Sequence, residues 1–247
     1  MDQAWIIPAI PAAIFIVVAL FGRLLPRQGD FLVILGGLSL VTIVFSMFPG
    51  FQAAFHDGHF APDGRNVFAF DWVNINHGFF VIPFSTYVDS ITMVMLPVVT
   101  IVALMVMIYS VGYMHGEPRY HWYFAVLSLF IAAMLTLVLS GNLIQLYLAW
   151  EGVGLASFLL IGFYWERQSA AEAAKKAFIT TRIGDVGLLI GIILLWRATG
   201  TFDIQGIIAA ATAHQIDHTY LTVAMLFLFM GAVGKDRKST RLNSSHT

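Results

Sequence analysis

Long apolar stretches separated by short polar connections dominate the sequence. Their approximate bounds are Ala4–Leu25, Phe31–Phe48, Tyr87–Tyr113, His121–Ser140, Asn142–Tyr164, Phe178–Trp196 and Tyr220–Gly234. Because a helix rises about 1.5 Å per residue, about 20 apolar residues are enough to cross the hydrocarbon core of a bilayer. The pattern therefore predicts an all-α polytopic membrane protein with about seven transmembrane helices.

The composition supports the membrane prediction and excludes several kinds of site. Of the 247 residues, 59% are hydrophobic and 11% are charged, whereas a soluble domain carries about 25% charged residues. The net charge of −1 favours neither nucleic acid nor an anionic surface as a partner. The sequence has no cysteine, so disulfides, thiolate-bound iron–sulfur clusters and cysteine-based zinc sites are excluded. The first residues lack the basic n-region of a signal peptide, so the first apolar stretch is predicted to be a retained span.

The basic residues predict the orientation of the chain, because Lys and Arg are enriched in connections on the inner side of a membrane. With the N-terminus outside, the inner connections hold more of them than the outer ones. The inner set is Arg23, Arg27, Arg119, Arg167, Lys175 and Lys176, and the outer set is Arg65 and Arg197. We therefore expect the N-terminus to lie outside.

Two connections on the outer side hold further structure. In the longer one, Pro49–Thr86, the segments Val67–Ile75 and Phe79–Phe84 are rich in aromatic and β-branched residues and are flanked by turn signals. These segments predict a small β-hairpin lying on the membrane. The other connection, Thr199–Thr219, contains Ile204–Ala213, which predicts a short apolar helix at the membrane interface.

Glu151 is the single charged residue of the stretch Asn142–Tyr164. Nine residues into a helix correspond to a depth of about 13 Å, which is close to the middle of a bilayer. An ionisable group at that depth costs about 2.5–3.5 kcal/mol on insertion scales, and such groups usually serve a function. We therefore expect Glu151 to belong to a functional site; the alternative is a carboxylate that only pairs with another helix.

Three more charged residues lie inside apolar stretches. Arg182 and Asp185 are three residues apart, hence on one helix face and within reach of an ion pair. Lys235 closes the last stretch directly after Gly231 and Gly234, two glycines that predict a break in the helix. A buried carboxylate and a buried ammonium that move together or apart change each other's proton affinity. These residues and Glu151 are the predicted proton relay, and a static ion pair is the alternative.

Small residues at helix-packing spacing occur in several of the predicted spans. Gly152 and Ala156 are four residues apart with Gly154 between them, and Gly187 and Gly191 repeat the spacing. Such pairs let two helix backbones approach closely inside a membrane. The spacing indicates a helix bundle and does not distinguish between functions.

Two pairs of histidines have a spacing that a metal ion could use. They are His56 with His59 and His214 with His218. Both pairs lie in predicted outer connections without the third and fourth ligands that a metal site needs. We therefore expect no metal site, and we expect no cofactor-binding site on this chain.

Four segments together resemble a known family. They read LYLAWEGVGLASFLLIGFY, AAKKAFITTRIGDVG, MGAVGK and YVDSITMVMLPVVTIVALMVMIYSVGYMHGEPRY. Through these segments the chain resembles the antiporter-like L subunit of bacterial NADH–quinone oxidoreductase, respiratory complex I. The resemblance implies a proton-translocating membrane subunit without a redox centre, coupled to quinone reduction elsewhere in the complex. It matches Glu151 to the family's fifth-helix glutamate, Lys235 to the seventh-helix lysine, and Arg182 with Asp185 to the charged pair of the sixth helix.

The resemblance also implies how the chain is organised. Residues 1–86 would form a two-helix region with an outer loop, and residues 87–235 an incomplete first repeat of the family's inverted-repeat fold. The polar residues 236–247 differ from everything before them and are expected to be a non-native tail of a truncated fragment.

The implied partners are other membrane subunits of complex I, neighbouring antiporter-like subunits above all, and the lipid bilayer. The implied location is the bacterial inner (plasma) membrane, and the complex as a whole would use NADH, FMN, iron–sulfur clusters and quinone.

Other functions remain open alternatives. The large subunit of an Mrp-type sodium–proton antiporter and a subunit of a membrane-bound hydrogenase share the tryptophan–glutamate–glycine block and this charge pattern. An alternative from another class is a structural membrane protein whose buried charges only lock helices together. A further alternative is an inactive fragment.

Overall fold

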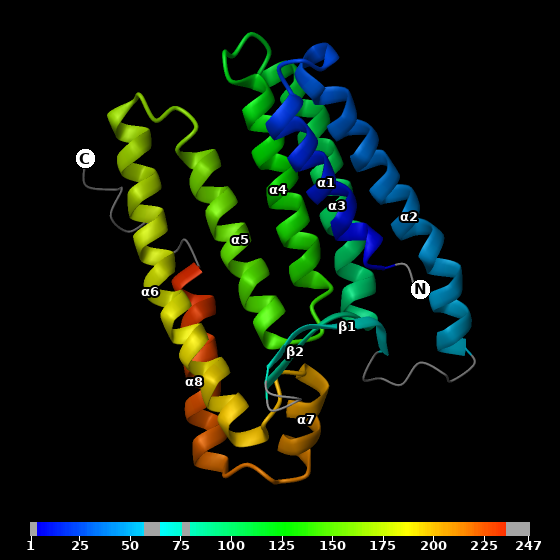
Figure 1. Cartoon of the computed structure of the whole chain (residues 1–247), viewed down its shortest axis with the longest axis vertical. Coiled ribbons are helices and arrows are strands. Elements are labelled where there is room, and N and C mark those ends of the chain that lie inside the picture. The colour runs from blue at the N-terminus through cyan, green and yellow to red at the C-terminus, as the bar shows by residue number, and fades with distance from the viewer. Residues whose placement is uncertain (1–3, 57–64, 76–79, 236–247) are drawn as a thin grey trace. The chain divides into compact units, whose positions relative to one another are not determined.

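The computed structural model describes residues 4–56, 65–75 and 80–235, and these residues are mainly helical (Figure 1). The elements, in chain order, are α1 (Ile6–Phe21), a 3₁₀ turn (Pro26–Gly29), α2 (Asp30–His56), β1 (Arg65–Ile75), β2 (Phe80–Val88), α3 (Ser90–Tyr113), α4 (Tyr120–Val138), α5 (Leu143–Ile161), α6 (Gln168–Thr199), α7 (Ile204–Thr212) and α8 (His218–Lys235). The chain forms two compact units, Met1–Gly141 and Asn142–Thr247. The first unit ends after α4, and the boundary between residues 86 and 87 that the resemblance implied stays a prediction.

Six helices of the described residues are long and apolar enough to cross a membrane, by length and composition. They are α2 together with the turn before it, α3, α4, α5, α6 and α8. The prediction of an all-α polytopic membrane protein is therefore confirmed. The first predicted span is shorter than expected, because α1 has 16 residues and is about 24 Å long, less than the hydrocarbon core of about 30 Å.

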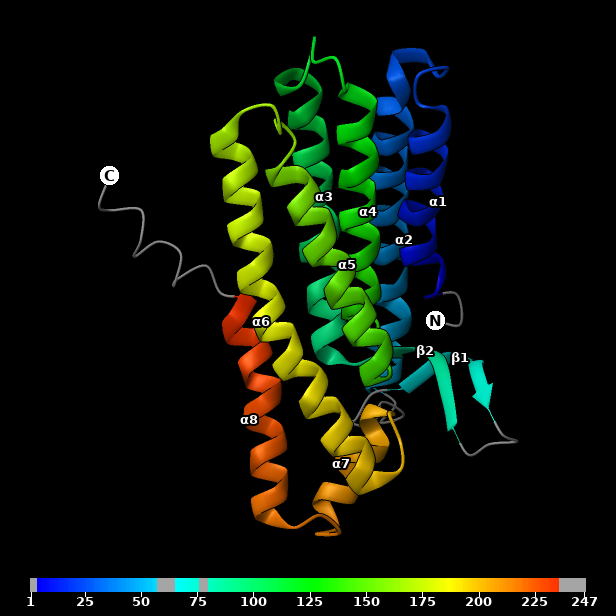
Figure 2. The same ribbon diagram turned by 60° about the vertical axis from the view of Figure 1, so that its left-hand side comes forward.

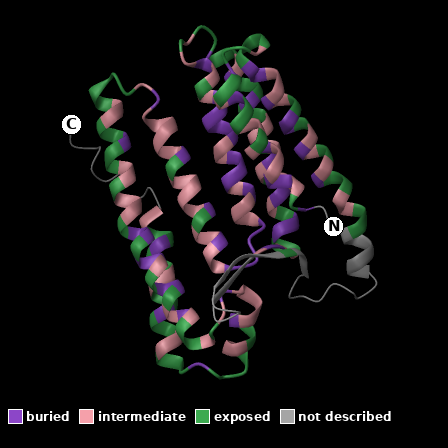
Figure 3. Cartoon of the chain, in the orientation of Figure 1, coloured by how far each residue is buried: buried purple, intermediate pink, exposed green. Residues whose placement is uncertain are grey.

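The first unit contains α1 to α4 as neighbouring helices (Figures 1 and 2). In this unit α1 packs on α4 and α2 packs on α3, and α4 is the most buried of the unit's spans (Figure 3). Two glycines of α2 allow the close packing. A Cβ on Gly36 would collide with Ile14 of α1, and one on Gly37 would lie 2.9 Å from the Met107 Sδ of α3.

The turn between α1 and α2 places a carboxylate inside the first unit. Arg27, Gln28 and Gly29 follow one another with φ angles of 51°, 55° and 86°, a left-handed conformation that favours glycine. The turn leads into Asp30, which is buried and accepts a hydrogen bond of 2.8 Å from the hydroxyl of Tyr120 at the start of α4. This bond ties the beginning of α2 to the beginning of α4.

The two strands predicted in the long connection are present. β1 and β2 pair antiparallel from Arg65 opposite Val88 to Ile75 opposite Phe80, with two irregularities in the register; residues 76–79 between them lie outside the described part. β2 continues to Val88, so the prediction that the third helix begins at Tyr87 was wrong by three residues. The side chain of Asp89 accepts a hydrogen bond of 2.6 Å from the Thr92 amide and caps α3 instead.

The second unit contains α5 to α8. The N-terminal cap of α5 is Asn142 and that of α7 is Asp203, and each side chain accepts a hydrogen bond of 2.8 Å from an amide three residues further on. α6 has 32 residues and begins ten residues before the predicted Phe178, because polar residues form its first turns. The short helix predicted at Ile204–Ala213 is present as α7, and its placement at a membrane interface stays a prediction.

Candidate functional site

The helices α6 and α8 lie side by side in both views of the second unit (Figures 1 and 2), and glycines set their separation. A Cβ on Gly184 would lie 2.8 Å from the Gly234 Cα, and a Cβ on Gly234 would lie 2.6 Å from the Gly184 Cα. A Cβ on Gly231 would lie 2.7 Å from the Leu188 Cβ. The two backbones therefore touch near the end of α8.

The structure gives Gly231 and Gly234 a different role from the one predicted. The sequence predicts a helix break at these glycines, but α8 continues as a helix through both of them to Lys235. Within the described residues their effect is close approach to α6. Glycine has no Cβ, and this single property accounts for both the predicted break and the observed contact. It weakens a helix, and it lets a second helix come closer.

Gly187 and Gly191 lie against the same partner helix. A Cβ on Gly187 would lie 2.8 Å from the Met230 Sδ, and one on Gly191 would lie 2.8 Å from the Leu228 amide nitrogen. Both positions thus face α8 along the line that continues from Gly184. On α5, Ala156 is buried and Gly152 is partly buried.

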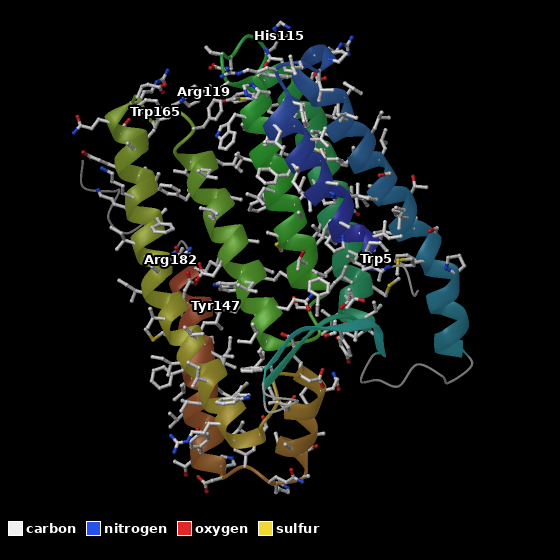
Figure 4. The ribbon with its side chains drawn as sticks, viewed as in Figure 1. Trp5, His115, Arg119, Tyr147, Trp165 and Arg182 are labelled. Atoms are coloured by element: carbon white, nitrogen blue, oxygen red, sulfur yellow. The ribbon has the colours of Figure 1, made fainter. Side chains whose placement is uncertain are left out.

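The charged residues of α5 and α6 form a cluster around Arg182. Arg182 makes an ion pair with Glu151 of α5, and its Nη1 lies 3.9 Å from the Asp185 Oδ2 on its own helix. The exposed fractions of the side chains are 34% for Arg182, 19% for Glu151 and 4% for Asp185. Figure 4 shows Arg182 on α6 together with Tyr147, which lies one turn before Glu151 on α5. Two carboxylates from two helices thus share one guanidinium.

Trp150 connects this cluster to Lys235. Its indole Nε1 donates a hydrogen bond of 2.7 Å to the Asp185 Oδ1, and its backbone carbonyl accepts one of 2.6 Å from the Lys235 Nζ. The same Nζ lies 4.2 Å from the centroid of the Trp150 ring, a cation–π contact. Residues of α5, α6 and α8 are therefore linked into one chain of polar contacts.

Gly154 lies beside the two cations. A Cβ at this position would lie 3.6 Å from the Arg182 Nη2 and 3.9 Å from the Lys235 Nζ. The sequence predicts helix packing for Gly154, and among the described residues the groups within 4 Å of this Cβ are these two charged side chains. Both cations thus approach the same point on α5.

The predicted relay residues come together, but the carboxylate of Glu151 and the ammonium of Lys235 do not form an ion pair with each other. The described contacts place Arg182 beside Glu151 and hold Lys235 at the carbonyl and ring of Trp150. No carboxylate of the described residues lies within ion-pair distance of Lys235. The cluster has two carboxylates and two cations, so its charges balance, which is what a site inside apolar helices requires.

Two aromatic residues of the site were not predicted. Phe178 lies under the Arg182 guanidinium, with 4.5 Å between its ring centroid and the Cζ, and Trp150 provides the bonds described above. A signal for Trp150 is present in the sequence: it falls inside a span, whereas tryptophan usually lies at the ends of spans. A buried indole N–H needs an acceptor, which here is Asp185.

The described part of the chain holds no group of three or more His, Cys, Asp or Glu that could bind a metal ion. His214 and His218 flank the connection between α7 and α8. His59 lies outside the described residues.

Two protein families match the chain in order. Residues 72–124 match the family described as NADH-ubiquinone oxidoreductase (complex I), chain 5 N-terminus, and residues 140–238 match the one described as NADH:quinone oxidoreductase/Mrp antiporter, transmembrane. The charged cluster falls inside the second match. The chain is thus similar to antiporter-like membrane subunits over both of these ranges.

Curated relatives narrow this class. The chain is 38% identical over 246 residues to the chloroplast NAD(P)H-quinone oxidoreductase subunit 5 of Zygnema circumcarinatum, an alignment that covers 95% of this chain and 34% of the relative. It is 42% identical over 165 residues to the NAD(P)H-quinone oxidoreductase chain 5 of Synechocystis sp., covering 64% of this chain and 24% of that relative. The chain is similar to these NAD(P)H-quinone oxidoreductase subunits and spans about a third or less of their length.

A solved structure has the same fold. The Mrp complex from Dietzia sp. contains a chain that superimposes with a TM-score of 0.76 at 21% identity, covering 95% of this chain and 24% of that one. At this identity the similarity supports the fold alone.

Proposed function

We propose that the chain acts as a proton-translocating membrane subunit of an NADH–quinone oxidoreductase. The observation that carries the proposal is the cluster of Glu151, Arg182, Asp185 and Lys235, which lies inside three apolar helices and is connected through Trp150. Four ionisable groups within helices long and apolar enough to span a membrane are costly and usually mark an ion pathway. The similarity to NAD(P)H-quinone oxidoreductase subunits supports the choice of complex.

In this proposal, protons pass through the cluster because Arg182 can exchange carboxylate partners. The guanidinium is paired with Glu151 and lies 3.9 Å from the Asp185 Oδ2. When Glu151 takes up a proton, its ion pair weakens and Arg182 shifts toward Asp185. With the guanidinium nearer to Asp185, Lys235 passes its proton to water or to the next group of the pathway, and its neutral amine can still donate a hydrogen bond to the Trp150 carbonyl.

The proposal includes the assembly and the location. The partners are the other membrane subunits of the complex, neighbouring antiporter-like subunits and lipid, and the membrane is the inner membrane of a bacterium with the N-terminus outside. NADH, FMN, iron–sulfur clusters and quinone would bind to other subunits. Quinone reduction there would drive the changes in this chain, which contributes to an NADH–quinone translocase without a redox site of its own.

The test is transport by the assembled complex with Glu151→Gln, a change that removes the charge and keeps the shape. We expect proton translocation per assembled complex to fall by about 10-fold or more, which corresponds to about 1.4 kcal/mol or more of lost coupling. The matched control is Glu172→Gln, because Glu172 is exposed on α6 and bonds with Gln168. Equal transport in both variants would rule out the proposed relay.

An Mrp-type sodium–proton antiporter is the second candidate, because one matching family includes such antiporters and the Dietzia structure has the same fold. The two functions differ in the ion that is moved. Transport that requires sodium and proceeds without quinone reduction would favour the antiporter. A membrane hydrogenase subunit would instead couple to hydrogen, and a structural fragment would leave transport unchanged when Glu151 is replaced.

A further inference from the structure

We propose that Trp150 is a positioning residue of the proton relay. Its indole side chain holds the side chains of Asp185 and Lys235 at fixed positions relative to α5. This inference rests on the proposed function, because it assigns a role within the same site. Trp150 is the residue of α5 that contacts both of these ionisable groups, one on α6 and the other on α8.

The first part of the role concerns the Asp185 carboxylate. The indole Nε1 donates to the Oδ1 at 2.7 Å, while the Oδ2 points to Arg182 at 3.9 Å. The Asp185 side chain is 4% exposed, so its oxygen atoms depend on protein donors. The indole bond therefore fixes which oxygen atom is available to Arg182.

The second part concerns the Lys235 ammonium. It is held by the backbone carbonyl of Trp150 at 2.6 Å and by the ring, whose centroid is 4.2 Å away. The carbonyl remains whatever side chain occupies this position, so the ring is the part that a substitution removes. Gly154, one turn further along α5, leaves space beside the ammonium.

The two groups that Trp150 contacts are fixed relative to each other by the helix packing. Asp185 follows Gly184 and Lys235 follows Gly234, and at these two glycines the backbones of α6 and α8 lie against each other. A movement of α5 along this pair of helices would therefore change both Trp150 contacts together. Trp150 thus couples the position of α5 to the groups that hold protons.

The test compares Trp150→Phe, which keeps an aromatic ring and loses the N–H, with Trp150→Leu, which loses both. Proton translocation is measured in the whole complex and divided by the amount of complex assembled. We expect a fall of about 5-fold or more with Phe and a further fall of about 3-fold with Leu. The control is Trp122→Phe in the first unit, which is expected to transport as the unchanged protein does.

The outcomes separate a positioning role from a structural one. If Trp150 only stabilises the bundle, both variants lower the amount of assembled complex but transport per complex stays within about 2-fold, and the inference is overturned. Lys235→Ala distinguishes the inference from the proposed function. If the Trp150 variants transport normally and Lys235→Ala is impaired, only the role of Trp150 is refuted. If Lys235→Ala transports protons at the full rate, the relay itself is refuted.

Discussion

Replacing Gly184 by alanine tests the contact on which the geometry of the site depends. The new Cβ would lie 2.8 Å from the Gly234 Cα and 3.3 Å from the carbonyl oxygens of Gly231 and Met230. Two carbon atoms pack best at about 3.5–4.0 Å, so α6 and α8 would have to separate by roughly 1 Å. All three groups belong to the backbone of α8, and no side-chain rotation relieves the overlap. Overpacking of this kind costs about 1–3 kcal/mol.

Thermal unfolding of the purified chain in detergent measures this cost. At about 2–4 °C per kcal/mol, Gly184→Ala should lower Tm by about 2–12 °C. Gly50→Ala is the matched control, because Gly50 lies within α2 and a Cβ there would meet nothing within 4 Å. The same substitution at Gly184 should weaken the bonds of Trp150 to Asp185 and Lys235. A melting temperature of Gly184→Ala within about 1 °C of the control would refute the close contact of α6 with α8.

Two further substitutions test single hydrogen bonds. Tyr120→Phe removes the hydroxyl that donates to the buried Asp30 and should lower the free energy of unfolding by about 1–3 kcal/mol; Tyr109→Phe, at an exposed position, should change it little, and equal effects would contradict the prediction. Asp203→Ala removes the cap that accepts from the Gly206 amide and should cost about 1 kcal/mol. Asp203→Asn should retain most of that stability in the same unfolding measurement, and a full loss with Asn would show that capping is not the cause.

The helices could be predicted because their apolar residues extend over whole spans. The bounds of α4 and α5 lie within three residues of those expected, since polar or turn residues end each of these helices, and α8 begins two residues before the expected Tyr220. α6 is longer than its apolar stretch because helix formation does not require apolar residues, and Lys175 and Lys176 occupy its polar first turns. The two strands were also recognisable, from their aromatic and β-branched residues.

The ionisable residues could be found from the sequence, but their partners could not. A charge inside an apolar span is visible in one dimension, which is how Glu151, Arg182, Asp185 and Lys235 were identified. Which cation approaches Glu151 depends on the rotation of three helices about their axes, and the sequence pattern does not determine that rotation. The structure pairs Glu151 with Arg182, and it holds Lys235 at Trp150.

The glycines show the same limit in another form. Gly231 and Gly234 were expected to break α8, and Gly154 was expected to pack against a helix. The missing side chain is compatible with a break, with a close helix contact or with space for a neighbouring cation. Only the positions of Gly184, Arg182 and the other neighbours decide among these possibilities.

The most direct test of the relay is to remove the charges of Glu151 and Arg182 together. Arg182→Gln leaves the partly buried Glu151 without its cation, and Glu151→Gln leaves Arg182 with Asp185 as its remaining carboxylate. Each single change should therefore lower assembly, by about 1–3 kcal/mol of stability at this exposure. The double variant is neutral at this pair and should regain assembly, whichever role the ion pair has.

Proton translocation per assembled complex is the measurement that separates the two roles. If Glu151 carries protons through exchange with Arg182, the double variant should assemble and still transport at about a tenth of the normal rate or less. If the pair only joins α5 to α6, the double variant should regain transport together with assembly. Transport restored to near the normal rate would contradict the account.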